Sequence, residues 1–433
     1  MINMARSQEK RIKRGNTDWW IHEKSMVGRN GLTYIAYVTD VGEVHIKEMD
    51  AKCSRSISRD VCLCTLNCDY SDEHNAPSIC VMDDGIIVVV YTGHAATHSL
   101  KYCVTQRPYD IMSFGPETDL PYTGSVTYAQ LSYNSARKEL WLFTRVSSVT
   151  WEFRVSKDKG ESWSDPTTFL RSDAGGLFYF DIRKQLVRTQ KGPKERWLFA
   201  LYGHPRISKD HTIRSGIFDA EGYLCTMDGE RTEKNLFAGN ELMLSDLVTV
   251  YEAPEGTSVR LLAVSPMEPC RVALCPFELD KPETGYYLSA TYKDGKWCLS
   301  KPIAGIGEFL QHGYGQGDLG SSTYVGGMAY YWGVGEAGFN WWTGVTHSNR
   351  LYLARCDEKN WLLESYVSHD AGDSYCLEQV IRTIPKEKNI KIWRPTVPIR
   401  AQGNMPVYWH EGHYTSHTGG WDCDTVMLVE YDD

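Results

Sequence analysis

Short runs of β-branched and aromatic residues recur along the whole chain, and Gly, Asp, Asn or Pro separates each run from the next. Runs of this kind, with turn residues between them, are typical of β-strands joined by hairpins. No long window keeps the apolar period of about 3.6 residues that marks an amphipathic helix, so we expect few helices. The pattern predicts an all-β protein, with strands at residues 86–91, 140–146, 197–202, 259–264, 286–292, 328–332, 351–354 and 406–409.

Two turn sequences share one pattern, S-x-D-x-G-x-x-aromatic. Residues 156–163 read SKDKGESW and residues 368–375 read SHDAGDSY, while residues 292–297, YKDGKW, look like a shortened copy. In such a turn the Asp accepts backbone N–H groups, the Gly takes a positive φ, and the aromatic ring packs beneath the blade. The pattern resembles the Asp-box of sialidase-type β-propellers, where it joins the third and fourth strands of a blade. That resemblance implies a structural role for these turns.

The chain length fits a ring of such blades. Divided by seven, 433 residues give about 62 residues for each unit, which favours a single seven-bladed β-propeller over six blades. No linker-like or low-complexity stretch divides the chain, so we predict one domain over residues 1–433. Residues 1–18 are expected to form a flexible N-terminal segment.

Charge and composition exclude several classes of protein. Lys plus Arg number 46 against 55 Asp plus Glu, a net charge of -9 without a long basic run, which argues against nucleic-acid binding. No stretch approaches the roughly 18 apolar residues that span a membrane. No apolar stretch follows the positive charges near the N-terminus, so we expect no secretory signal. We therefore expect a cytoplasmic protein, a monomer, with its 13 cysteines reduced. A secreted protein trimmed of its signal is the alternative.

A more specific resemblance begins at residue 72. Five segments carry it: DEHNAP at 72–77, DGIIVVVYTGH at 84–94, RPYDI at 107–111, TYAQL at 127–131 and LWLFTR at 140–145. They resemble the BNR-4-type propeller polysaccharide lyases, which include ulvan lyases and L-rhamnose-α-1,4-D-glucuronate lyases. The resemblance covers about residues 70–165 and is looser beyond. Matched motif by motif, it implies four catalytic residues: His74, His94, Tyr128 and Arg145.

The chemistry of a uronate lyase explains why these residue types are needed. The enzyme removes the C5 proton, α to the carboxylate, and expels the oxygen at C4. The ionised carboxylate opposes this, so charge-assisted donors must neutralise it, and Arg145 suits that task, with His74 as a further donor. His94 and Tyr128 then supply the base and the acid, and their spacing does not decide which does which. The reaction requires no organic or redox cofactor; a structural calcium or other divalent ion in the channel stays open.

Later aromatic-basic clusters are candidates for substrate binding. Aromatic faces pack on the C–H surfaces of sugars, while His and Arg bind acid or hydroxyl groups. On this basis we predict substrate contacts for His204, Arg206, His312, Tyr314, Arg394, Trp409 and His410.

The sequence predicts no metal site. The Cys-x-Cys-x3-Cys run at residues 62–68 lacks the paired Cys-x-x-Cys knuckles typical of zinc sites. Some relatives carry a structural metal further along the chain; here His211 and Cys225 would remain as ligands, but Ile213 and Met227 are not ligands.

We therefore predict a lyase that cleaves a 4-linked uronic acid in an acidic oligosaccharide or polysaccharide, with L-rhamnosyl-α-1,4-D-glucuronate as the favoured linkage. One alternative is a glycoside hydrolase of sialidase or α-L-rhamnosidase type. The aromatic-Arg-Ile-Pro run that opens sialidases is absent from the first 60 residues. The other alternative is a carbohydrate-binding propeller without catalysis.

Overall fold

The computed structural model describes residues 7–14, 25–39, 41–50, 58–66, 73–147, 149–171, 178–189, 192–204, 210–279, 281–307, 326–331, 350–399, 407–416 and 420–430. Within these ranges the helical segments are single 3-10 turns: η1 (Glu73–Asn75), η2 (Ile111–Ser113), η3 (Leu236–Ala238), η4 (Leu244–Asp246), η5 (Pro282–Thr284) and η7 (Lys386–Lys388). None of them could cross a membrane. The prediction of an all-β protein is confirmed.

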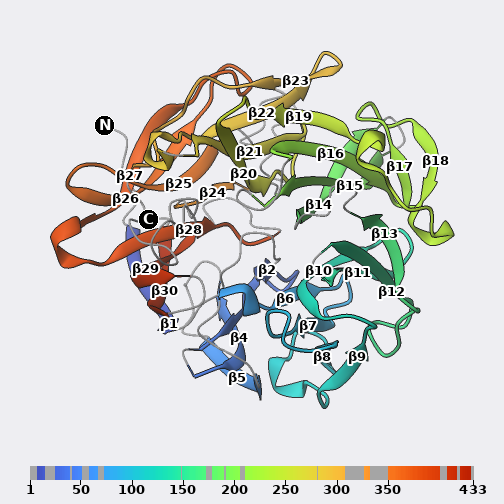
Figure 1. Ribbon diagram of the computed structural model, residues 1–433. Helices are drawn as coiled ribbons and strands as arrows, with labels where there is room; N and C mark the ends of the chain where they lie inside the picture. The colour runs from blue at the N-terminus through green and yellow to red at the C-terminus, as the bar shows by residue number, and fades with distance from the viewer. Residues whose placement is uncertain are drawn as a thin grey trace.

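The described strands form seven sheets, and Figure 1 shows these sheets as the blades of one ring. The first blade contains β2 (Ser25–Val27), β3 (Leu32–Val38), β4 (Glu43–Asp50) and β5 (Ser58–Thr65). The second contains β6 (Ser78–Val81), β7 (Ile87–Tyr91), β8 (Ser99–Val104) and β9 (Thr118–Pro121). The third contains β10 (Val126–Asn134), β11 (Glu139–Val146), β12 (Thr150–Ser156) and β13 (Thr167–Arg171).

The fourth blade is the largest, with β14 (Phe178–Thr189), β15 (Gly192–Gly203), β16 (Thr212–Asp219), β17 (Tyr223–Cys225), β18 (Arg231–Asn235) and β19 (Val248–Glu252). The fifth contains β20 (Thr257–Val264), β21 (Arg271–Glu278), β22 (Leu288–Lys293) and β23 (Lys296–Leu299). The sixth contains β24 (Met328–Tyr330), β25 (Arg350–Cys356), β26 (Asn360–Val367) and β27 (Cys376–Pro385). The seventh contains β28 (Lys391–Thr396), β29 (Tyr408–Ser416), β30 (Gly420–Glu430) and β1 (Ser7–Arg14).

The N-terminal strand closes the ring. β1 pairs antiparallel with β30, from Ser7 opposite Glu430 to Arg14 opposite Asp424. Within the N-terminal segment expected to be flexible, residues 1–18, the structure thus has residues 7–14 as a paired strand. The reason is tertiary: the last blade would otherwise end in an unpaired strand edge, and the polar sequence SQEKRIKR shows no apolar alternation that would reveal the pairing.

The two full Asp-box turns join the third and fourth strands of their blades, as the sequence predicts. Ser156 ends β12 and pairs with Leu140 at the start of β11, whereas Trp151 pairs with Arg145 near the end of β11. The third blade thus carries its Asp-box at one end and Arg145 at the other.

Each Asp-box is held by the same hydrogen bonds. The Ser156 hydroxyl donates to Asp158 at 2.8 Å, the backbone N–H of Gly160 donates to Ser156 at 2.7 Å, and that of Ser162 donates to Asp158 at 2.9 Å. Gly160 has φ +94°, a conformation that side chains resist. The aromatic ring that ends the motif, Trp163, meets Tyr102 of the second blade edge-on at 6.1 Å. The turns therefore fasten one blade to the next.

Aromatic side chains fill the space between blades. Trp141 of β11 and Trp197 of β15 are both fully buried, with ring centroids 4.4 Å apart. The indole N–H of Trp197 donates to the Ser132 hydroxyl at 2.7 Å, which satisfies its polar atom. Packing of this kind fixes the third blade against the fourth, and the candidate site lies at the channel end of these two blades and the second.

Candidate active site

Two histidines of the second blade lie face to face. His74 belongs to η1, which precedes the inner strand β6, and His94 follows β7. Their rings stack with centroids 4.1 Å apart and planes 13° apart. His74 is 3% exposed and His94 is half-buried. The Asn75 side chain accepts the backbone N–H of His94 at 2.7 Å, so the two segments are tied together.

Tyr128 lies beside this pair in a strained backbone. Its φ is +61°, and the pairing of β10 with β11 shifts register between Thr127 and Ala129. The Thr144 hydroxyl donates to the Tyr128 carbonyl at 2.6 Å and holds this bulge. Its ring centroid is 5.8 Å from that of His74 and 6.2 Å from that of His94. Such a backbone costs about 1–3 kcal/mol and is typical of strands that redirect a functional side chain.

Arg145 of β11 covers the ring of Tyr128. Its guanidinium carbon is 4.5 Å from the centroid of Tyr128 and 5.4 Å from that of Tyr179. The side chain is 4% exposed, and its Nε and Nη1 atoms are buried without a hydrogen-bond partner among the described residues. Buried N–H groups are almost always bonded in folded proteins. A buried guanidinium with bonding capacity left over is suited to an anionic ligand.

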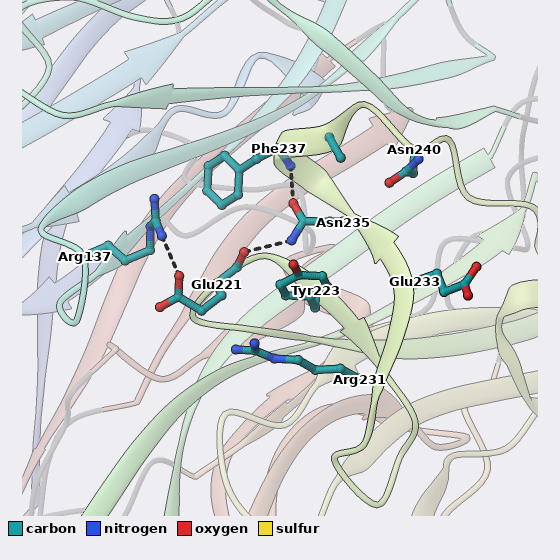
Figure 2. A pocket seen from close by; sticks show the side chains of 9 residues that line it. Arg137, Glu221, Tyr223, Arg231, Glu233, Asn235, Phe237 and Asn240 are labelled. Carbon is teal, nitrogen blue, oxygen red and sulfur yellow. Dashed lines mark hydrogen bonds and ion pairs between the residues drawn. The ribbon is translucent and has the colours of Figure 1, made fainter.

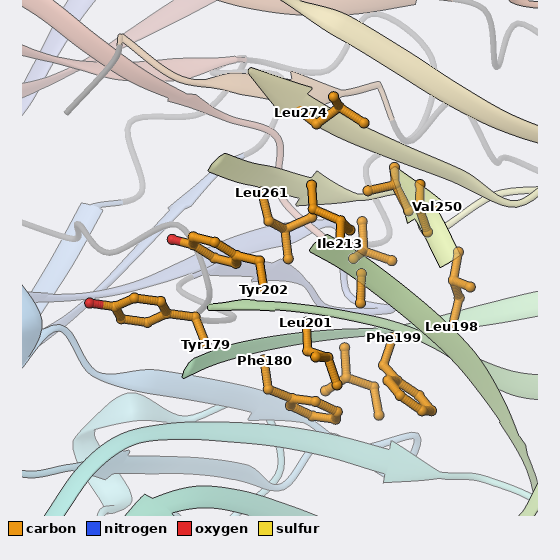
Figure 3. Packing of buried hydrophobic residues seen from close by; sticks show 14 of the residues in the cluster. Tyr179, Phe180, Leu198, Phe199, Leu201, Tyr202, Ile213, Val250, Leu261 and Leu274 are labelled. Carbon is orange, nitrogen blue, oxygen red and sulfur yellow. The ribbon is translucent and has the colours of Figure 1, made fainter. Parts of the chain in front are cut away.

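Two tyrosines of the fourth blade extend this aromatic surface. Tyr179 of β14 pairs in register with Tyr202 of β15, and their rings stack at 5.1 Å. Figure 3 shows both rings directed the same way, away from the apolar cluster around Phe180 and Leu201. Tyr179 is not among the site residues predicted from the sequence. The sequence signal that could have identified it is its position near the start of the inner strand β14, which matches the position of Tyr128 in β10.

His204 joins this cluster. It follows β15, is 8% exposed, and its ring centroid lies 5.9 Å from that of Tyr179. Of the predicted substrate-binding residues, it is the one that described contacts link to the catalytic candidates. Arg206, His312 and Tyr314 lie outside the described residues.

The remaining substrate-binding candidates lie on the seventh blade. Arg394 of β28 is 3% exposed, with φ +50° at a register shift between Trp393 and Thr396. His410 of β29 is 2% exposed, and its ring centroid is 5.7 Å from that of Trp393. These two residues are therefore buried, on a different blade from the four catalytic candidates.

The prediction that Trp409 binds substrate is not supported by its position. The side chain is 1% exposed and belongs to the main hydrophobic core. Its indole N–H donates to Glu411 at 2.8 Å, and Glu411 also accepts from Arg382 at 2.7 Å. With both its ring face and its polar atom occupied by protein, Trp409 has a packing role. Strand alternation turns it away from the side that His410 occupies.

A separate surface groove lies on the outer rim of the fourth blade (Figures 1 and 2). Both of its arginines are already paired, since Arg137 donates to Glu221 at 2.7 Å and Arg231 donates to Asp219 at 2.5 Å. Asn235 bridges the groove wall by donating to the Glu221 carbonyl and accepting from the Phe237 backbone N–H. The stacked histidines and the strained backbone of Tyr128 lie outside this groove, so we place the candidate active site at the channel end.

Comparison with known proteins agrees with this geometry. Residues 32–180 match the BNR_4 family model, described as "BNR repeat-containing family member". The resemblance predicted from residues 72–145 is thus confirmed, and the matched segment contains His74, His94, Tyr128, Arg145 and Tyr179.

Three curated relatives are all ulvan lyases. "Ulvan Lyase-PL25" of Pseudoalteromonas sp. (strain PLSV) is 28% identical over 119 residues, 23% of this chain and 23% of that protein. The ulvan lyase of Alteromonas sp. (strain LOR) is 27% identical, with the same coverage. That of Nonlabens ulvanivorans is 23% identical over 36% of this chain and 37% of its own length. The chain thus spans about a quarter to a third of the length of these relatives.

Similar solved structures cover nearly the whole chain. A PL25 ulvan lyase bound to -[GlcA(1-4)Rha3S]- has a TM-score of 0.68 at 13% identity, over 96% of this chain and 95% of that one. The polysaccharide lyase Uly1 has a TM-score of 0.53 at 12% identity, over 95% and 90%. At these identities the likeness establishes the propeller fold.

Proposed function

We propose that the protein is a polysaccharide or oligosaccharide lyase that cleaves a 4-linked uronic acid by β-elimination. The observation that carries the proposal is the buried Arg145 guanidinium, which lies over the ring of Tyr128, while that ring lies beside two stacked histidines. This arrangement combines a fixed positive charge with three groups able to move or donate a proton. It is the set of functions that abstraction of a proton α to a carboxylate requires.

In this proposal Arg145 and His74 hold the substrate carboxylate. As C5 loses its proton, negative charge builds on the carboxylate oxygens, and donors already in position stabilise that charge without having to reorganise. Arg145 offers a planar fork that matches both oxygens. His74 is fixed by stacking on His94, so its ring nitrogens have a defined direction.

Tyr128 and His94 transfer the protons. One group takes the C5 proton and the other protonates the O4 leaving group, giving a 4,5-unsaturated uronate and a new chain end. The positive charge of Arg145 over the Tyr128 ring favours negative charge on the phenol oxygen during transfer. The strained backbone and the Thr144 hydrogen bond keep the ring in this place.

For the substrate, we propose a rhamnosyl-α-1,4-glucuronate linkage. The support is the naming of three relatives as ulvan lyases and a similar structure bound to -[GlcA(1-4)Rha3S]-. Tyr179 and Tyr202 offer a stacked aromatic surface next to Arg145, on which the apolar face of a neighbouring sugar would pack.

The test is the product. The protein is incubated with ulvan, ulvan oligosaccharides, chondroitin and polygalacturonate, and ultraviolet absorbance of the unsaturated uronate is followed together with reducing ends. We expect both signals to rise together with the ulvan substrates. Reducing ends without ultraviolet absorbance would indicate a hydrolase. Binding with neither signal would indicate a carbohydrate-binding propeller.

A further inference from the structure

A second cluster of side chains able to bind a metal ion lies on the first blade, whereas the candidate active site lies on the second, third and fourth blades. Glu43 and His45 stand two residues apart on β4 and therefore share one face of the strand. Cys62 of β5 lies directly opposite His45 in the sheet. Carboxylate oxygen, imidazole nitrogen and thiol sulfur from these three residues all lie within 4.8 Å of one another.

We propose that Glu43, His45 and Cys62 bind a zinc ion. Thiolate, imidazole and carboxylate are the ligand types that zinc takes in proteins, with bonds of about 2.0–2.3 Å. The Nε2 atom of His45 is already 3.1 Å from the Glu43 carboxylate, a separation compatible with two corners of a zinc tetrahedron. A thiolate and a carboxylate also balance the charge of the ion, and a water completes four ligands.

The surroundings of His45 are those of a metal ligand. Its Nδ1 atom is 2.7 Å from Asp60, which leaves Nε2 directed toward Glu43. Asp60 in turn accepts the Tyr37 hydroxyl at 2.7 Å, and the Tyr37 and His45 rings stack at 5.4 Å. Metal-bound histidines almost always donate their second ring N–H to a carboxylate, a backbone carbonyl or water, which fixes the ring and strengthens it as a ligand. His45 is 8% exposed, so this orientation is held by packing.

The sheet irregularity explains why cysteine spacing did not reveal the site. The pairing of β4 with β5 shifts register so that Cys62 opposes His45 and Cys64 opposes Val44, with Leu63 as the extra residue. Cys64 is hydrogen-bonded to Tyr91 and Glu117 of the second blade, and burial raises the pKa of its thiol to about 12. Cys62, by contrast, is exposed, and its thiol donates to the Cys64 carbonyl at 3.6 Å. The two cysteines therefore have different surroundings, and it is the Cys62 sulfur that lies within 4.8 Å of the ligand atoms of Glu43 and His45.

The role of this ion is to join the two outer strands of the first blade. Glu43 and His45 belong to β4 and Cys62 to β5, so the ion cross-links strands that the bulge has partly unpaired. Binding to the folded state but not to the unfolded chain raises the unfolding temperature. We expect zinc to change stability and to leave the rate of polysaccharide cleavage unchanged.

The experiment uses the full chain, freed of metal by chelation and titrated with zinc chloride or cobalt chloride. We expect one zinc ion per chain, a rise in Tm on addition, and a thiolate-to-cobalt charge-transfer band with cobalt. Cys62→Ser should abolish the band and the zinc-dependent rise in Tm. Cys376→Ser, which removes another exposed strand cysteine, is the matched control and should behave as wild type.

A variant outside the ligand set tests the geometry. Asp60→Asn keeps all three ligands and should weaken zinc binding by about 10–100-fold, as expected for a carboxylate behind a ligating histidine. No zinc uptake by the wild-type protein would overturn the proposal. So would a cobalt complex without the thiolate band, or equal zinc affinity in the wild-type and Cys62→Ser proteins.

Discussion

Two arginines of the third blade each lie over a buried tyrosine, and the two arginines are bonded differently. Arg145 lies over Tyr128 at 4.5 Å, and Arg154 lies over Tyr122 at 4.4 Å. The two arginines are 4% and 6% exposed. Arg154 donates from Nη1 to the Ser164 carbonyl at 2.9 Å and from Nη2 to the Pro121 carbonyl. Among the described residues, both Nε and Nη1 of Arg145 have no hydrogen-bond partner, whereas in Arg154 only Nε has none.

The difference separates a structural arginine from one suited to a ligand. A buried charge is tolerated when hydrogen bonds replace its water, and the two backbone carbonyls do this for both Nη groups of Arg154. Arg145 has its donors left over, next to a tyrosine with φ +61°. The strained backbone of Tyr128 and the incompletely bonded Arg145 thus lie at one end of the third blade, and the hydrogen-bonded Asp-box lies at the other end. The predictions below test this contrast.

The largest expected effect is on Tyr128. Tyr128→Phe removes only the hydroxyl, and we expect the initial rate of unsaturated-uronate formation to fall about 10²–10⁴-fold, the usual contribution of a general acid or base. Thermal unfolding should be unchanged, because the ring still packs. Tyr122→Phe is the control and should keep the wild-type rate. A wild-type rate in Tyr128→Phe would remove this residue from the chemistry.

Lysine substitutions sharpen the contrast between the two arginines. Arg145→Lys keeps the charge but loses the planar fork, and we expect the rate to fall about 10²–10³-fold with little change in Tm. Arg154→Lys should have the opposite effect, because the lysine cannot keep both bonds to backbone carbonyls. We expect the free energy of unfolding to fall by roughly 1–3 kcal/mol and the rate per folded molecule to remain unchanged. Initial rates and melting curves measured on both variants decide this. Equal behaviour of the two would contradict the distinction drawn here.

A smaller effect is expected at the other end of the blade. Asp158→Ala removes the acceptor of the Ser156 hydroxyl and the Ser162 backbone N–H. We expect a loss of about 1–2 kcal/mol in the free energy of unfolding and an unchanged rate per folded molecule. Asp165→Ala, which removes an exposed carboxylate just beyond the turn, should alter neither. Loss of activity in folded Asp158→Ala would mean that the turn influences the site at the far end.

The smallest effect is a pH dependence of the second Asp-box. Hydrogen bonds from the Ser374 hydroxyl and backbone N–H and from Ser368 lower the pKa of Asp370 well below its ordinary range. A lowered folded-state pKa gives stability that is complete above the unfolded pKa, about 3.9, and is lost as the pH falls through the folded value. The Tm difference between wild type and Asp370→Asn should therefore be constant from neutral pH to about pH 5 and shrink below about pH 4. A Tm difference between wild type and Asp370→Asn that grows as the pH falls would contradict a lowered pKa of Asp370 in the folded protein.

Local signals in the sequence identified the strands, the turns and the four catalytic candidates. Runs of β-branched and aromatic residues, and the turn residues between them, depend on near neighbours and can be read from the chain. The Asp-boxes lie where predicted, between third and fourth strands. The four catalytic candidates, identified by resemblance, do come together: His74, His94 and Tyr128 have ring centroids within 6.2 Å of each other, with Arg145 above.

Only the tertiary structure decided the features that depend on pairing between distant segments. The sequence SQEKRIKR forms a strand because β30 offers an edge more than 400 residues later. Trp409 is a core residue because its indole N–H donates to Glu411 and its ring packs within the main hydrophobic core. Tyr179 enters the site, and Cys62 meets His45, through the registers of β14 with β15 and of β4 with β5. Register is fixed by how whole sheets twist and pack together, and no short window of sequence contains that information.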